Sequence, residues 1–137
     1  MDAFVIDVSA CMPWCCEDEA TPASEQLLQL ASQSHTLYVP SVWPWEMMNA
    51  VAVAVRRQRI KPEHAVSFLG LLSSFDFRIE ESPKVADLPT LHALALRHQL
   101  TAYDTAYLDL AKRLDLPLAT LDDALKRAAS AEGVQLL

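Results

Sequence analysis

Apolar and polar residues alternate along the chain in blocks that predict short strands separated by helices. Brief apolar runs of strand length are found at 3–8, 36–40, 77–81, 116–120 and 134–137. Helices are expected, from apolar spacing and from start and stop signals, at 21–33, 43–59, 61–74, 88–99, 101–115 and 122–131. This order favours a parallel sheet with helices on both faces, because parallel strands need helical crossovers.

The segment 43–59 is ambiguous, because its centre, AVAVAV, alternates as a strand would. Both alternating residues are apolar, however, so the period of two carries little information. Pro44 near the start and arginines at the end favour a helix.

The first strand ends at a charged residue. The stretch FVIDVSA runs from three apolar residues directly into Asp7. Removing an unpaired carboxylate from water is costly, so Asp7 must reach the rim, cap a turn or meet a positive group. The carboxyl ends of parallel strands are also where α/β proteins build their sites.

Length and composition indicate one domain, residues 1–137, with a real core. The chain has 137 residues, of which 52% are hydrophobic and 21% charged. No apolar run is long enough to span a membrane, and the N-terminus does not resemble a signal peptide. We therefore expect no membrane association and a cytoplasmic location.

Charge and residue usage exclude several function classes. A net charge of −7 disfavours non-specific coating of duplex DNA. Only two glycines, Gly70 and Gly133, are present, so no phosphate-binding glycine loop can form. Three clustered cysteines, Cys11, Cys15 and Cys16, are expected to be free thiols, since their number is odd and histidines at zinc-ligand spacing are absent.

Four acids lie at strand ends or helix starts: Asp7, Glu46, Asp104 and Asp122. Each has a purely structural explanation. Asp7 would cap a turn, and Glu46 would meet the positive end of a helix dipole. Asp104 fits a capping box with Thr101, and Asp123 fits one with Thr120.

Taken together, the four acids suggest a cation site. The predicted topology brings them toward one end of the sheet, where like charges would raise one another's pKa. Mg²⁺ prefers oxygen ligands and needs few carboxylates, and two such ions can act together on a phosphodiester.

The chain resembles the PIN-domain ribonucleases of the VapC toxin type over nearly its whole length. The stretches that carry the resemblance are FVIDVSA, VPSVWPWEMMNAV and LTAYDTAYLDLAKRLDLPLATLDDAL. The resemblance implies a five-stranded parallel sheet and an endoribonuclease that depends on Mg²⁺ or Mn²⁺. It maps the family's acidic quartet onto Asp7, Glu46, Asp104 and Asp122, and its helper polar positions onto Ser9, Asn49 and Thr120.

The resemblance also implies partners: an RNA substrate, a cognate antitoxin and a second copy of the chain in a homodimer. An antitoxin could place an Arg or Lys among the acids. The apolar surface expected to hold it consists of Val42, Trp43, Trp45 and the helix after Pro62. Tyr103 and Tyr107 are expected in the core or at an interface.

Three alternatives remain. A haloacid-dehalogenase-like phosphatase would need a second Asp where Ser9 stands. A receiver domain would need a lysine at the end of a late strand, where LPLAT ends in Thr120. A PIN fold that only binds a partner would not need the full quartet.

Overall fold

The computed structural model, which describes residues 2–81 and 83–137, contains a four-stranded parallel sheet. The strands are β1 (Ala3–Ile6), β2 (Thr36–Pro40), β3 (Asp76–Glu80) and β4 (Leu118–Ala119). Their order is β3-β2-β1-β4, and every pairing is parallel. The predicted α/β class with one parallel sheet is confirmed.

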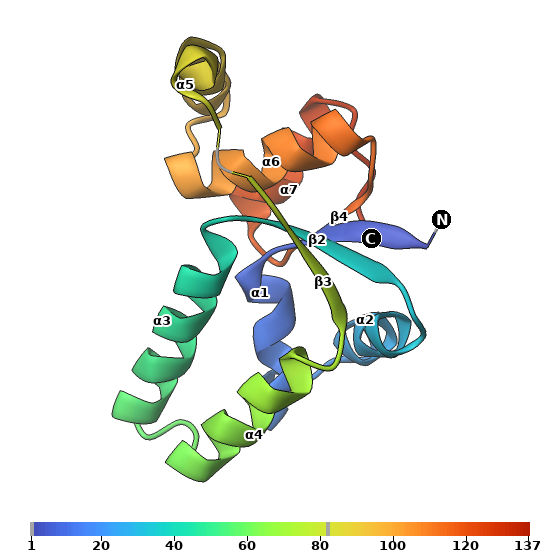
Figure 1. Ribbon diagram of the computed structural model, residues 1–137, viewed down its shortest axis with the longest axis vertical. Helices are drawn as coiled ribbons and strands as arrows, with labels where there is room; N and C mark the ends of the chain where they lie inside the picture. Colours follow the sequence, from blue (N-terminus) through green and yellow to red (C-terminus); the bar gives the residue numbers. More distant parts are fainter. Residues whose placement is uncertain (1, 82) are drawn as a thin grey trace.

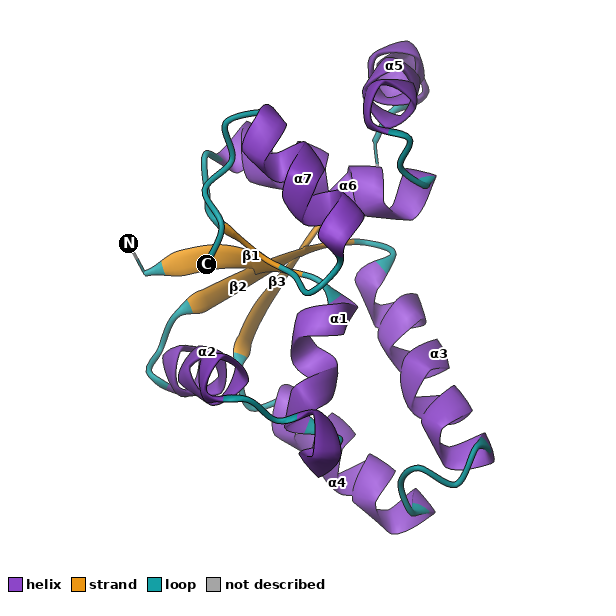
Figure 2. Cartoon of the chain, turned by 180° about the vertical axis from the view of Figure 1, so that it is seen from behind, coloured by secondary structure: helices purple, strands orange, loops and turns teal. Residues whose placement is uncertain are grey.

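Helices cover both faces of this sheet (Figure 1). Figure 2 shows α1, α2, α3 and α4 on one side and α6 and α7 on the other. The helices are α1 (Val8–Cys11), α2 (Pro22–Ser32), α3 (Trp43–Arg56), α4 (Pro62–Leu72), α5 (Leu88–His98), α6 (Ala102–Leu114) and α7 (Asp123–Ala131). The ambiguous segment is thus the helix α3, which begins at Trp43 with proline at its second position.

The expected fifth strand, 134–137, is reduced to a single parallel bridge between Leu118 and Leu136. Two backbone bonds make this bridge, from Leu118 N to Gln135 O (2.9 Å) and from Leu137 N to Leu118 O (3.0 Å). The neighbouring strand β4 has only two residues, so it offers too little backbone for a longer ladder.

The segment after β1 also differs from expectation. Rather than continuing as a strand to residue 8, the chain turns at Asp7 into α1, followed by two 3₁₀ turns, η1 (Met12–Trp14) and η2 (Glu17–Glu19). Asp7 has extended backbone and caps α1, because its carboxylate accepts from Ala10 N. This cap ends the strand one residue before the charge.

The core lies on both sides of β1, whose residues Phe4, Val5 and Ile6 are at most 1% exposed. From α6, Tyr107 and Leu108 pack against it. The starts of α1, α3, α6 and α7 gather at the end of the sheet toward which the strands run (Figure 1 and Figure 2). No helix within the described ranges is long and apolar enough to cross a membrane.

The helix α5 stands apart from the sheet and packs mainly on α6 (Figure 1). Glu132, just after α7, holds α5 in place through hydrogen bonds. Its carboxylate accepts hydrogen bonds from Arg97 Nη1 (2.9 Å), His98 Nε2 (2.6 Å) and Lys112 Nζ (2.6 Å). Hydrogen bonds from Lys112, His98 and Arg97 lower the pKa of Glu132 to about 2. One carboxylate therefore links the C-terminal ends of three helices.

Candidate metal centre

Asp7 is buried, with 5% of its surface exposed, and both of its carboxylate oxygens accept hydrogen bonds from hydroxyl or amide donors. Ser9 Oγ (2.6 Å) and Ala10 N (3.0 Å) donate to Oδ1, and Thr120 Oγ1 (2.5 Å) donates to Oδ2. Burial raises the pKa of Asp7 although these bonds lower it, and the charge of Asp122 raises it further. Hydrogen bonding thus holds Asp7 in place but does not neutralise its charge.

Asp122 is tied to Asp7 through the loop after β4. Thr120 Oγ1, which donates to Asp7, accepts from Asp122 N (3.1 Å). Ser9 Oγ likewise accepts from Leu121 N (2.9 Å). Ser9 in α1 and Thr120 after β4 therefore both bond Asp7 directly, and their hydroxyls connect α1 to the loop that leads to Asp122.

The predicted capping box of Thr120 and Asp123 is wrong. Asp122 itself is the N-cap of α7, and its Oδ1 accepts from Leu125 N (3.0 Å). Thr120 cannot cap this helix, because its hydroxyl is used between Asp7 and Asp122. Asp123 is exposed in the first turn.

Glu46 and Asp104 lie in the first turns of α3 and α6. Glu46 Oε1 accepts from the hydroxyl of Tyr107 (2.7 Å). Thr101 Oγ1 accepts from Asp104 N (3.1 Å), which is half of the predicted capping box. The box is complete in α2, where Thr21 and Ser24 each bond the other's amide; in the described bonds of α6 the return bond from Asp104 is missing.

The electrostatics of Asp104 show that the other three carboxylates act on it. Burial, followed by the charges of Asp122, Asp7 and Glu46 in that order, raises the pKa of Asp104 to about 6. Within residues 2–81 and 83–137, no basic side chain forms an ion pair with any of the four. The four acids therefore carry negative charge that no ion pair in the described part of the chain compensates.

The donor set suits a hard divalent cation. Hydrogen bonds to Asp122 and Glu46 engage one carboxylate oxygen each, and Oδ2 of Asp7 receives a single donor. Each side chain therefore retains lone pairs, and all of the atoms offered are oxygens, which Mg²⁺ and Mn²⁺ prefer. Asn49, in contrast, is exposed, and no described hydrogen bond joins it to the acids.

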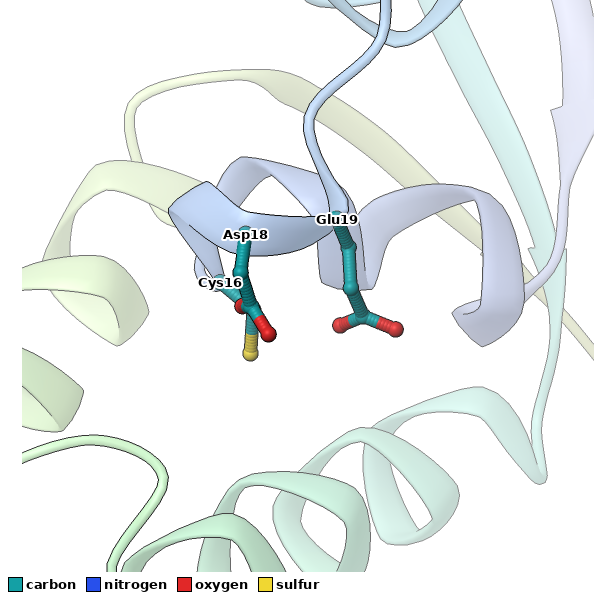
Figure 3. A group of neighbouring side chains, drawn as sticks. All are labelled: Cys16, Asp18 and Glu19. Carbon is teal, nitrogen blue, oxygen red and sulfur yellow. The ribbon is translucent and has the colours of Figure 1, made fainter.

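Within the described residues, no three acids of the quartet have ligand atoms that all lie within 4.8 Å of one another, whereas a different group of potential ligands, on and beside η2, does. Figure 3 shows Cys16, Asp18 and Glu19, whose ligand atoms lie within 4.8 Å of one another. Arg59 Nη2 already pairs with Asp18 (3.4 Å) and Glu19 (3.3 Å). Burial raises the pKa of Cys16, which keeps its thiol protonated. One arginine thus pairs with both of these carboxylates, whereas no ion pair to the quartet is found in the described residues.

Comparison with known proteins decides the family. A family model described as the PIN domain matches residues 4–131. The chain belongs to the PIN-domain family. This PIN domain is 30% identical to Ribonuclease VapC3 of Pyrobaculum aerophilum over 122 residues. The alignment covers 89% of this chain and 91% of that protein.

Solved structures support the fold of this PIN domain. VapBC2 of Rickettsia felis, bound to a promoter DNA fragment, matches with a TM-score of 0.67 and 17% identity, covering 98% of this chain and 97% of that one. VapC20 of Mycobacterium tuberculosis, a sarcin–ricin loop cleaving toxin, matches with a TM-score of 0.61 and 16% identity, covering 98% of each chain.

These findings confirm the predicted family and the predicted class, a PIN ribonuclease of the VapC type. They exclude the receiver domain and the haloacid-dehalogenase-like phosphatase. The hydrogen bond from Tyr107 to Glu46 is a side-chain contact of the acids that sequence reasoning missed. Tyr107 lies three residues after Asp104, a spacing that puts the two on neighbouring positions of one helix face.

Replacing Asp104 by Asn should stabilise the metal-free protein at pH 7.5 by about 1 kcal/mol, after allowance for solvent screening. A carboxyl whose folded pKa is raised to about 6 destabilises the fold when ionised, so wild-type stability should rise as the pH falls from about 7 toward 4. Asp104→Asn should weaken this pH dependence. Thermal unfolding in EDTA across that range measures both effects.

Asp109→Asn, on the same helix, is the matched control, because Asp109 pairs with Arg113 (2.8 Å) away from the quartet. The free energy of unfolding of this variant should be lower by a few tenths of a kcal/mol, and its pH dependence should match that of the wild type. If Asp104→Asn instead lowers stability at pH 7.5, the side chain acts as a helix cap and the repulsion argument is wrong.

Proposed function

We propose that this PIN domain is a metal-dependent endoribonuclease and the toxin of a toxin–antitoxin pair. Its Mg²⁺ or Mn²⁺ would be held by Asp7, Glu46, Asp104 and Asp122. The observation that carries the proposal is the electrostatic effect of three carboxylates on the fourth, Asp104, while none of the four has a basic partner within the described chain. The relative named Ribonuclease VapC3 supports the RNA substrate.

The cation would supply charge neutralisation and Lewis-acid activation of water and of a phosphodiester. The role of the protein itself is to fix the positions of the carboxylate oxygens that would bind the cation. Ser9, Ala10 and Thr120 fix the buried Asp7 carboxylate, and Thr120 also fixes the amide of Asp122. Such supporting bonds orient the ligands of a metal and are costly to remove.

Cleavage of a labelled single-stranded RNA by the purified protein should require Mg²⁺ or Mn²⁺ and stop in EDTA. Products should carry 5′-phosphate and 3′-hydroxyl ends. Asp7→Asn and Asp122→Asn should each lower the rate at least 100-fold, because each removes a charge from the proposed site.

The matched control is Asp123→Asn, which removes a neighbouring exposed acid and should retain near-wild-type cleavage. Cleavage that persists in EDTA would refute the metal mechanism. Loss of activity in Asp123→Asn but not in Asp122→Asn would show that the fourth carboxylate of the site is Asp123 and not Asp122.

A cognate antitoxin is the proposed protein partner. The R. felis complex named VapBC2 supports pairing of a VapC protein with a partner. An arginine from the antitoxin could bind the four carboxylates and compete with the cation, since its planar fork pairs with carboxylates bidentately.

The proposed antitoxin surface needs one correction from its sequence-based form. Trp43 is buried, with 7% exposed, and stacks on Phe77 with ring centroids 4.5 Å apart. Trp43 is therefore too buried to form part of a binding surface for the antitoxin. Trp45 and Met48, three residues apart on α3, are 71% and 50% exposed, and Val66 on α4 is 71% exposed.

Trp45→Ala should weaken antitoxin binding at least tenfold, because a large exposed aromatic residue contributes strongly when a partner buries it. Isothermal titration with the antitoxin measures this effect, and Val85→Ala, an exposed apolar change away from α3, is the control. The proposal predicts that Asp7→Asn keeps most of the affinity. Wild-type affinity in Trp45→Ala together with lost binding in Asp7→Asn would contradict it.

A second copy of the chain is the proposed occupant of a groove of about 860 Å³ between α5 and the start of α6. Leu88, Leu96 and Tyr103, which line it, are 51%, 65% and 58% exposed. Because Tyr103 adjoins Asp104 in sequence, a dimer formed there would join two acid clusters into one larger surface.

Leu96→Asp should convert a dimer into a monomer, because it places a charge in the apolar groove. Sedimentation analysis of the wild type and of this variant measures the change. Leu137→Asp, which alters an exposed apolar residue outside the groove, should remain dimeric. A monomeric wild type would refute the homodimer.

A further inference from the structure

Tyr107 connects the two helices that carry Glu46 and Asp104. It lies on α6 and is 2% exposed, and its hydroxyl donates to Glu46 Oε1 at 2.7 Å. No other hydrogen bond to the Glu46 carboxylate is found in the described part of the chain. A single phenol from the core therefore restrains an acid that is itself only partly buried.

The bond restrains a side chain that is otherwise free to rotate. A glutamate has three rotatable side-chain bonds, so a partly exposed one occupies several rotamers unless a contact selects among them. A hydrogen bond to one carboxylate oxygen selects a rotamer and leaves the second oxygen available. A donor to an ionised acceptor also makes a stronger bond than a neutral pair does.

The donor is held more firmly than the acceptor. The ring of Tyr107 belongs to the hydrophobic core, among its largest fully buried side chains. A phenol is protonated at neutral pH and a carboxylate oxygen only accepts, so the hydroxyl of Tyr107 is the donor in this bond. The packing of the core therefore fixes the position of the hydroxyl that contacts the partly buried Glu46.

We propose that Tyr107 is a positioning residue, which orients the Glu46 carboxylate for cation binding through the hydrogen bond between its hydroxyl and Oε1. This inference rests on the proposed function, in which Glu46 is a metal ligand. It differs from a packing role, because packing depends on the ring and positioning depends on the hydroxyl.

Tyr107→Phe separates the two roles, since it keeps the ring and removes only the hydroxyl. Mn²⁺ binding, followed by electron paramagnetic resonance of the free ion, should weaken 10- to 100-fold, the usual cost of losing a residue that orients a metal ligand. Cleavage should then need more Mn²⁺ for half-maximal rate, with an unchanged KM for RNA. Thermal unfolding in EDTA verifies that the variant is folded.

The control variant is Tyr38→Phe on β2, which removes a tyrosine hydroxyl elsewhere. It should bind Mn²⁺ as the wild type does. Wild-type Mn²⁺ affinity in Tyr107→Phe, or the same loss in both variants, would overturn the positioning role.

Glu46→Gln distinguishes this failure from failure of the proposed function. If Glu46→Gln binds Mn²⁺ weakly while Tyr107→Phe binds normally, the metal site stands and only the role of Tyr107 is wrong. If Glu46→Gln also binds normally, Glu46 is not a ligand and both proposals fail. The double variant should bind Mn²⁺ no more weakly than Glu46→Gln alone, because the hydroxyl acts only through Glu46.

Discussion

Repulsion among carboxylates is the constraint around which this protein is organised. Asp7 is buried at the end of the central strand, and Asp104 has its pKa raised to about 6 by burial and by the three other acids. Such crowding destabilises the metal-free fold at neutral pH. Hydroxyl and amide donors hold the carboxylates in place, but none of them carries a positive charge. This uncompensated charge is the basis for our proposal that a cation from outside the chain binds there.

The same acids also serve the backbone. Asp7 caps α1 and Asp122 caps α7, each through Oδ1, while Glu46 and Asp104 sit in first turns, where a helix dipole favours negative charge. Capping and metal binding were alternatives at the level of sequence. In three dimensions they are compatible, because a carboxylate has two oxygens and a cap uses only one. Four helix starts at one end of a parallel sheet thus concentrate acids and partly offset their repulsion.

Much of this was predictable from the sequence. Helix signals predicted α3 despite its alternating centre. Because strand ends and helix starts converge in a parallel sheet, the four acids could be chosen as candidates for one site, and the family resemblance indicated the same four. Tertiary contacts were not predictable. The hydroxyl of Thr120 bonds Asp7, 113 residues away, so it cannot cap the adjacent helix. The bond from Tyr107 to Glu46 spans 61 residues, and the burial of Trp43 depends on stacking with Phe77. Periodicity reports only which face of an element is apolar.

The most direct measurement is an anomalous difference map from crystals soaked in MnCl₂ and recorded at a wavelength where Mn scatters anomalously. The account predicts a peak among the carboxylates of Asp7, Glu46, Asp104 and Asp122, which disappears in crystals of Asp7→Asn. A peak only beside Cys16, Asp18 and Glu19, or no peak at saturating Mn²⁺, would contradict it.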